Sequence, residues 1–315
     1  MGNIAYYLKY RPQALPELIG QESVKKTLLS SFEENRLSHA YLFVGPRGTG
    51  KTSTARILAK MVNCPAKQNV PCNECEVCIS ITDGSNMDLI EIDAASNRGI
   101  EDIRSLREKI KLSPTSLKKK VYIIDEAHML TTEAFNALLK TLEEPPAHAL
   151  FILATTELGK IPQTILSRVQ RLDFKLAAQD EILEVFEKII NKEKINIEPE
   201  ALKVLVKRAE GSFRDGVKLL DQISSGKGKI TVEALQADLK STRFDELLDL
   251  VKNVSGRNSA KSLLNVSKQM EQGIDTRELI TSLMDFLRSL TLIKNGVGEE
   301  LVKPQFSEDK YKEMM

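Results

Sequence analysis

Short apolar runs alternate with amphipathic stretches in the first half of the chain. The runs are typical of strands that are buried on both faces of a parallel sheet. They predict strands at Ala40–Val44, Asp88–Asp93, Val121–Asp125 and Ala149–Ala154, with Gln170–Phe174 as a candidate fifth. Apolar residues at helical spacing predict helices over Gln21–Asn35, Lys51–Val62, Ile100–Ile110 and Thr132–Leu142. Because strands alternate with helices, we expect an α/β fold, a parallel sheet with helices on both faces.

The pattern changes after residue 178, where strand signals stop and amphipathic helices follow. They are predicted at Asp180–Asn191, Pro199–Ala209, Phe213–Ile223 and Thr231–Leu239. Three more helices are predicted between residues 243 and 295, with breaks near Gly256 and Gly273. Residues 63–82 hold two prolines and read as an irregular insertion, and residues 296–315 are polar with weak periodicity. We therefore expect an α/β domain over residues 1–178, a helical domain over 179–241 and a second helical domain over 242–315.

Composition places the chain among ordinary globular proteins, with 42% hydrophobic and 28% charged residues. A disordered chain would lack the apolar residues for a core. The net charge is +1, so any nucleic-acid contact must come from a local basic face or be shared with other subunits. No apolar stretch approaches the ~20 residues of a membrane span, and the N-terminus has no signal-peptide pattern. We expect a cytoplasmic protein without a membrane contact.

The segment Gly45–Thr52 reads Gly-Pro-Arg-Gly-Thr-Gly-Lys-Thr and matches the phosphate-binding loop G-x-x-x-x-G-K-[ST]. It follows a predicted strand and begins a predicted helix, which is the context that this motif requires. The glycines allow backbone N–H groups to surround phosphates, and the helix N-terminus adds partial positive charge. Lys51 is predicted to reach the β- and γ-phosphates, and the Thr52 hydroxyl to bind Mg²⁺.

A second apolar strand ends in Asp125 and Glu126. Asp125 is predicted to hold the metal and Glu126 to polarise an attacking water as a general base. Two adjacent acids after the strand favour hydrolysis over transfer to a small acceptor. No Asn-Lys-x-Asp motif, which would read guanine, is present in the sequence, so we expect ATP rather than GTP. Thr155, at the end of another predicted strand, is a candidate for orienting that water. His39, His128 and His148 share no spacing and are interpreted as structural or exposed.

All four cysteines, Cys64, Cys72, Cys75 and Cys78, lie within one short segment. In a reducing compartment such spacing favours a metal site over disulfides. Four thiolates suit a closed, tetrahedral, structural Zn²⁺ site. A redox-active C-x-x-C pair and an iron–sulfur cluster are the rival interpretations.

These motifs together closely resemble the γ/τ family of bacterial DNA polymerase III clamp-loader subunits, which are AAA+ ATPases. The resemblance covers nearly the whole chain, and the cysteine segment directly after the phosphate-loop helix is its most discriminating feature. Other segments that carry it are Lys9–Pro12, Ile19–Glu22, Ser38–Phe43, Asp93–Arg98, Asp125–Leu130, Phe135–Pro146 and Ala154–Glu157. It implies an AAA+ RecA-like domain with a zinc module over 63–82, an all-α lid and an incomplete collar-type domain.

The resemblance also assigns roles to residues that physical reasoning does not single out. Thr155 resembles a first sensor of the γ-phosphate, Arg214 a second sensor on the lid, and Arg168 an arginine finger for a neighbouring subunit. With Lys51, Asp125 and Glu126 they form the expected catalytic set. The expected ATP- and Mg²⁺-binding residues are Tyr10, Arg11, Pro12, Gly45, Gly48, Thr49, Gly50, Lys51, Thr52, Ser53, Asp125 and Arg214. Candidate DNA-backbone contacts are Arg98, Arg104 and Lys140.

The implied function is that of an ATP-driven motor subunit that opens a sliding clamp and loads it on primer–template DNA. Its implied partners are δ- and δ′-type subunits, further copies of itself, the clamp and DNA. The finger motif of the family is usually Ser-Arg-Cys and here reads Ser167-Arg168-Val169. The collar region is shorter than usual, and the polymerase- and helicase-binding domains of the long form are not found. The alternatives are a nucleotide-bound scaffold without turnover and a DEAH-type helicase.

Overall fold

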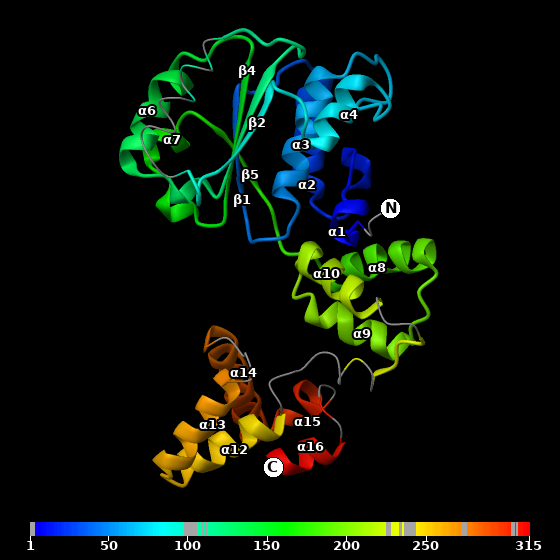
Figure 1. Cartoon of the computed structure of the whole chain (residues 1–315), viewed down its shortest axis with the longest axis vertical. Helices are drawn as coiled ribbons and strands as arrows, with labels where there is room; N and C mark the ends of the chain where they lie inside the picture. The colour runs from blue at the N-terminus through cyan, green and yellow to red at the C-terminus, as the bar shows by residue number, and fades with distance from the viewer. Residues whose placement is uncertain are drawn as a thin grey trace. The chain divides into compact units, whose positions relative to one another are not determined.

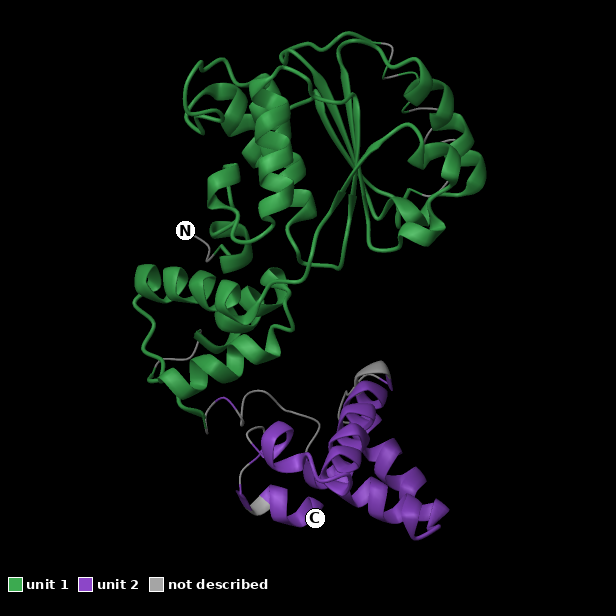
Figure 2. Ribbon diagram, turned by 180° about the vertical axis from the view of Figure 1, so that it is seen from behind, with its two compact units in different colours: residues 1–232 green, residues 233–315 purple. Residues whose placement is uncertain are grey.

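The computed structural model divides into two compact units, residues 1–232 and residues 233–315 (Figure 2). It describes residues 4–97, 106, 108, 110, 112–224, 228–232, 235, 244–271, 276–303, 306 and 308–315. None of the helices in these residues is long and apolar enough to cross a membrane.

A parallel five-stranded sheet forms the centre of the first unit, in the order β2-β3-β4-β1-β5 (Figure 1). The strands are β1 Ala40–Val44, β2 Leu89–Asp93, β3 Lys120–Asp125, β4 Ala149–Thr155 and β5 Gln170–Asp173. All five predicted strands are therefore confirmed, and their ends differ from prediction by at most one residue.

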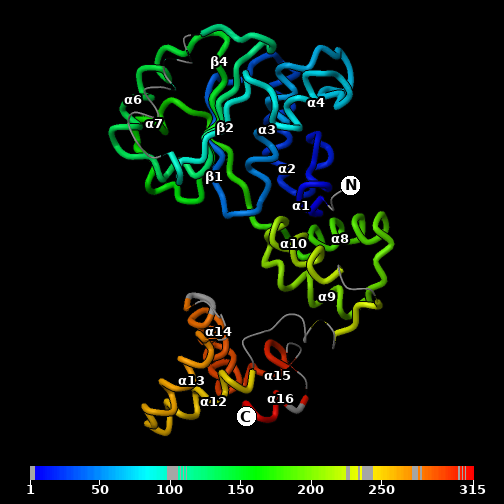
Figure 3. The backbone as a smooth tube through the Cα atoms, in the orientation of Figure 1, coloured from blue at the N-terminus to red at the C-terminus, as the bar shows by residue number. Residues whose placement is uncertain are grey.

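Helices cover both faces of this sheet, as the alternation predicted. Helices α2 (Glu22–Glu33) and α3 (Lys51–Asn63) lie on one face, and α6 (Thr132–Glu143) and α7 (Gln163–Leu166) on the other (Figures 1 and 3). Strand β1 is buried throughout, and its successive residues serve opposite faces. Tyr41 and Phe43 join the core beneath α3, whereas Ala40, Leu42 and Val44 join the core beneath α6.

Short N-terminal helices and a group of helices after the sheet complete the first unit. The former are α1 (Tyr6–Lys9) and η1 (Leu15–Glu17), and the latter are α8 (Gln179–Glu193), α9 (Pro199–Arg208) and α10 (Phe213–Ser224). The Tyr6 backbone N–H donates to Asp221 Oδ2 at 3.0 Å, which ties α1 to α10. The predicted helices at Ile100–Ile110 and Thr231–Leu239 lie mostly outside the described residues.

Two segments for which the sequence predicts no regular structure contain helices. The predicted irregular insertion contains a helix, α4 (Glu76–Asp83), which is capped by Cys75 Sγ as it accepts the Cys78 backbone N–H. In the weakly periodic C-terminal segment, helices form at α15 (Gly298–Leu301) and α16 (Glu308–Met314).

Tyr311 and Met314 anchor α16 in the core of the second unit, and both are buried. The other helices of this unit are α12 (Phe244–Ser255), α13 (Ser259–Glu271) and α14 (Thr276–Lys294), which confirm the three predicted there.

A buried carboxylate, Asp88, organises the loop that enters the central strands. Its Oδ2 accepts backbone N–H groups from Thr115 at 2.8 Å, Ser116 at 2.7 Å and Leu117 at 3.1 Å. Burial alone would raise the pKa of the Asp88 carboxyl, but these donors outweigh it and hold the pKa below its ordinary value. The charged form is therefore the one that stabilises the fold.

Replacing Asp88 by Asn should lower the free energy of unfolding by about 1–3 kcal/mol, because an amide accepts these donors less strongly. The contribution is complete above the ordinary carboxyl pKa and is lost as the pH falls through the lowered pKa. Denaturant unfolding from pH 7 to pH 3 would measure both effects. Asp83→Asn, at an exposed position, is the control. Equal stability of the two variants at pH 7 would contradict this account.

Candidate nucleotide site and cysteine cluster

The phosphate-binding loop connects β1 to α3 at one edge of the sheet. Gly48 has a φ of +77°, and a Cβ placed there would lie 2.0 Å from Ser212 Oγ. Only glycine therefore fits, because both the backbone conformation and the approach of the α10 end exclude a side chain. Thr49 Oγ1 donates to the Pro46 carbonyl at 2.9 Å and supports the turn from within.

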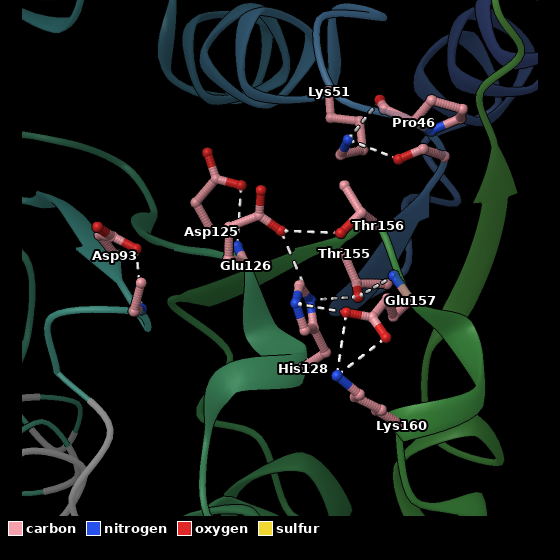
Figure 4. Close-up of polar contacts among 12 residues, drawn as sticks. Pro46, Lys51, Asp93, Asp125, Glu126, His128, Thr155, Thr156, Glu157 and Lys160 are labelled. Atoms are coloured by element: carbon pink, nitrogen blue, oxygen red, sulfur yellow. Dashed lines mark hydrogen bonds and ion pairs between the residues drawn. The ribbon is translucent and has the colours of Figure 1, made fainter. Parts of the chain in front are cut away.

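Lys51 is buried and turned onto its own loop. Its Nζ donates to the carbonyls of Gly45 at 2.7 Å and Pro46 at 2.8 Å (Figure 4). Burial lowers the pKa of this ammonium, while Glu126 and Asp125 act in the opposite direction. A phosphate oxygen would be a stronger acceptor than either carbonyl, so the ammonium can exchange these two carbonyls for a bound phosphate.

Asp125, at the end of β3, faces the start of α3. The Thr52 hydroxyl donates to Asp125 Oδ2 at 2.8 Å. A hydroxyl and a carboxylate of this kind are the ligands that Mg²⁺ takes in phosphate sites. Glu126 follows in the left-handed region, with φ of 49°, which costs energy for a residue with a side chain.

The Glu126 carboxylate is held by the residue that follows β4 and by the short helix η2 (Ala127–Met129). Its Oε2 accepts from Thr156 Oγ1 at 3.3 Å and lies 3.5 Å from His128 Nδ1 (Figure 4). The same nitrogen lies 3.1 Å from the hydroxyl of Thr155, which is fully buried. The structure thus brings together the predicted loop, both acids and Thr155.

The structure adds His128 and Thr156 to this group of polar residues. The ring of His128, for which the sequence indicates a structural or exposed residue, is buried in the polar contacts around Glu126. The signal that could have found it is its position two residues after Glu126, directly beyond a strand end.

The N-terminal end of α10 contacts the phosphate loop. The Phe213 backbone N–H donates to the Gly48 carbonyl at 3.1 Å. The Arg214 guanidinium carbon lies 5.5 Å from the centre of the Tyr7 ring, in a cation–π contact. Arg214 is therefore beside the loop, as a lid residue that contacts nucleotide would be.

The segment Tyr10–Pro12 lies between α3 and α8. Arg11 Nε donates to Ser53 Oγ at 3.0 Å, and the Tyr10 hydroxyl donates to Glu193. Burial, together with the nearby Arg56, lowers the pKa of Arg11 to about 10. Pro12 is half-buried in the same segment.

Arg168 is not among the residues that the structure gathers at the loop. Its Nη2 lies 2.5 Å from Glu143 Oε1, and its Nη1 donates to the Thr164 carbonyl at 2.6 Å. Lys140 is exposed on α6, and Arg98 and Arg104 lie outside the described residues.

The four cysteines converge between α3 and α4, with all four sulfur atoms within 4.8 Å of one another. Cys64 Sγ and Cys72 Sγ lie 3.6 Å apart. Zn–S bonds of about 2.3 Å in a tetrahedron require sulfur separations of about 3.8 Å, so the donor set fits such an ion. Backbone N–H groups of Glu74 and then Cys75 lower the pKa of the Cys72 thiol to about 6, which favours the ligating thiolate.

Lys60 fixes this cysteine loop to the rest of the first unit. Its buried Nζ donates to Gln13 Oε1 at 2.6 Å, Asn73 Oδ1 at 2.8 Å and Thr82 Oγ1 at 3.2 Å. The three acceptors come from the N-terminal segment, the cysteine loop and α4, so one ammonium holds all three together.

Two family profiles match the first unit, one over the sheet domain and one over the helices that follow it. Residues 20–178 match the profile of a family described as DNA polymerase III, delta subunit. Residues 181–228 match that of the DNA polymerase III clamp loader subunit, ATPase lid domain. The Thermotoga maritima RuvB Holliday junction branch migration motor has a similar structure, with a TM-score of 0.55 at 21% identity over 78% of this chain and 79% of that one. The chain thus shares the fold of that structure, and its parallel sheet with helices on both faces, followed by further helices, is as expected.

Relatives extend the match through much of the second unit. DNA polymerase III subunit tau of Bacillus subtilis is 46% identical over 94% of this chain and 53% of its own length. The tau subunit of Escherichia coli is 42% identical over 91% of this chain and 45% of its own. The chain therefore spans about half the length of these relatives. The gamma subunit of Buchnera aphidicola (subspecies Baizongia pistaciae) is 38% identical over 91% of this chain and 78% of its own length. At this identity and coverage, the chain belongs to the γ/τ subunit family of DNA polymerase III.

Proposed function

We propose that this protein is an ATP-hydrolysing motor subunit of a clamp loader, which opens a sliding clamp and loads it on primed DNA. The observation that carries the proposal is the contact between Thr52 and Asp125 at 2.8 Å, with Glu126 next to it. One edge of the sheet then offers a phosphate loop, a Mg²⁺ ligand pair and a candidate base. ATP and Mg²⁺ are the proposed ligands.

Functionally, we divide the chain into a nucleotide-binding domain over 1–178, a lid over 179–241 and a collar-type domain over 242–315. The proposed partners are δ- and δ′-type subunits, copies of this chain, the clamp and primer–template DNA, in the cytoplasm. Arg168 is proposed to act on a neighbour's nucleotide, and Arg98, Arg104 and Lys140 to contact the DNA backbone.

The two alternatives fit the observations less well. A DEAH-type helicase would need a second RecA-like domain, and the elements described after residue 178 are helices. A scaffold without turnover would have no use for Glu126 in a strained backbone conformation beside Lys51, Thr52 and Asp125.

Replacing Glu126 by Gln should leave ATP binding intact and slow turnover by about 100-fold or more, because the amide cannot accept a proton from water. Turnover would be measured in the loader reconstituted with its other subunits, clamp and primed DNA, and binding with a fluorescent ATP analogue. Glu133→Gln, exposed on α6, is the matched control. Turnover equal to that of the unmodified protein would exclude Glu126 as the base and remove the support for a motor.

Replacing Arg168 by Ala should leave ATP binding by the single chain unchanged and slow turnover of the assembled loader by about 1000-fold. Lys should not restore the rate, because it lacks the planar guanidinium. Arg171→Ala, an exposed arginine paired with Asp173, is the control. Equal loss in the single chain and the assembly would contradict a role between subunits.

We further propose that the cysteine cluster binds one structural Zn²⁺. Cys72→Ser should abolish zinc retention and lower the unfolding temperature, since metal binding supplies folding free energy to so small a module. Mass spectrometry of the intact protein and thermal unfolding would measure both. Glu74→Ser, at an exposed neighbour, is the control. Full stability without bound metal, or retention of iron instead, would refute the zinc site.

A further inference from the structure

His128 lies where three polar groups of the site meet. Its Nδ1 is 3.1 Å from Thr155 Oγ1 and 3.5 Å from Glu126 Oε2, and its Nε2 is 3.3 Å from Glu157 Oε1 (Figure 4). The side chain is only 7% exposed. Each ring nitrogen thus faces a carboxylate, and one of them also faces the hydroxyl that ends β4.

The surroundings of the ring are charged on both sides. Glu157 is paired with Lys160 Nζ at 2.9 Å, in the short helix η3 (Leu158–Lys160) that follows β4. That pair lowers the pKa of Glu157, first through the Lys160 hydrogen bond, and keeps the carboxylate charged opposite Nε2. Glu126 is the corresponding acceptor beside Nδ1. The imidazole therefore has a fixed orientation, with an acceptor carboxylate facing each nitrogen.

The Thr155 hydroxyl can make hydrogen bonds on both sides of its oxygen. Its oxygen already accepts the Glu157 backbone N–H at 3.0 Å, and it has a single hydrogen to donate. If Nδ1 carries a proton, it donates to Thr155 Oγ1 and leaves the hydroxyl hydrogen for a phosphate. If Nδ1 carries none, it accepts that hydrogen itself. Whether Nδ1 carries the ring proton therefore determines the direction in which the Thr155 hydroxyl hydrogen points.

We propose that His128 is a positioning residue that couples recognition of the γ-phosphate by Thr155 to the orientation of Glu126. This inference rests on the proposed function, in which Thr155 contacts the γ-phosphate and Glu126 is the base. With ATP bound, Thr155 donates to the phosphate and accepts from the His128 Nδ1–H, which also holds Glu126 Oε2 toward β4. Without a γ-phosphate, the Thr155 hydrogen turns back to Nδ1, the ring proton is carried on Nε2 opposite Glu157 instead, and Glu126 Oε2 loses its donor.

Two amide variants separate this role from simple packing. In His128→Asn the amide N–H takes approximately the place of Nδ1, within reach of Thr155. In His128→Gln the longer side chain places its amide nearer the position of Nε2, beside Glu157. Both are neutral amides, so a difference between them reports which contact matters.

The experiment measures steady-state ATP turnover of the reconstituted loader with clamp and primed DNA. His128→Ala and His128→Gln should lower kcat about 10- to 100-fold with KM for ATP changed less than about 3-fold, because a misplaced base slows chemistry rather than binding. His128→Asn should stay within about 3-fold of the unmodified protein. The ratio of ATP to ADP affinity should fall in Ala and Gln but not in Asn.

Controls distinguish failure of this inference from failure of the proposed function. Thermal unfolding identifies any variant that does not fold; if Ala fails, the comparison of Asn with Gln still decides. His39→Gln replaces another partly buried histidine, whose Nε2 contacts the Leu142 carbonyl at 3.1 Å. Equal kcat in Asn and Gln, or normal kcat in all three variants, would overturn the coupling. Unaffected turnover in Glu126→Gln would instead overturn the proposed function.

Discussion

The parallel order of the central sheet is the constraint on which the site depends. Strand β4 lies between β1 and β3, and all three run in the same direction. Their carboxyl ends therefore meet at one edge, where the phosphate loop, Thr155 and Asp125 follow. An antiparallel β4 would place Thr155 at the opposite edge. The close contacts there, such as Thr52 with Asp125, are a consequence of this pairing and of the burial of apolar residues on both faces.

A second set of contacts makes the nucleotide site a joint product of the sheet domain and the helices that follow it. The α10 end donates a backbone hydrogen bond to the phosphate loop, and the N-terminal segment contacts both α8 and α10. The phosphate loop is thereby in direct contact with a helix far along the chain. The polar groups of the site also form one network, in which His128 touches the groups that are assigned to sensing and to chemistry.

Elements and motifs were predictable from the sequence because local patterns encode them. Strand positions follow from apolar runs, and the loop and acids from residue types at fixed spacing. The helix α4 was not predicted, since its cap is a cysteine sulfur in a cysteine-rich segment. The contacts of His128 could not be predicted either, because Thr155 and Glu157 lie at the end of β4 and just beyond it, and their place beside His128 depends on how that strand pairs with β3. Arg168 shows the same limit: its residue type was evident, but its partner Glu143 belongs to another element.

That pairing of Arg168 has an energetic consequence for any assembly in which the residue changes partners. A guanidinium already bound to a carboxylate and a carbonyl gains only the difference between its old and new acceptors. Engagement across an interface would then be an exchange reaction with a small net free energy. A small net free energy favours subunit contacts that form and dissociate repeatedly over contacts that stay formed.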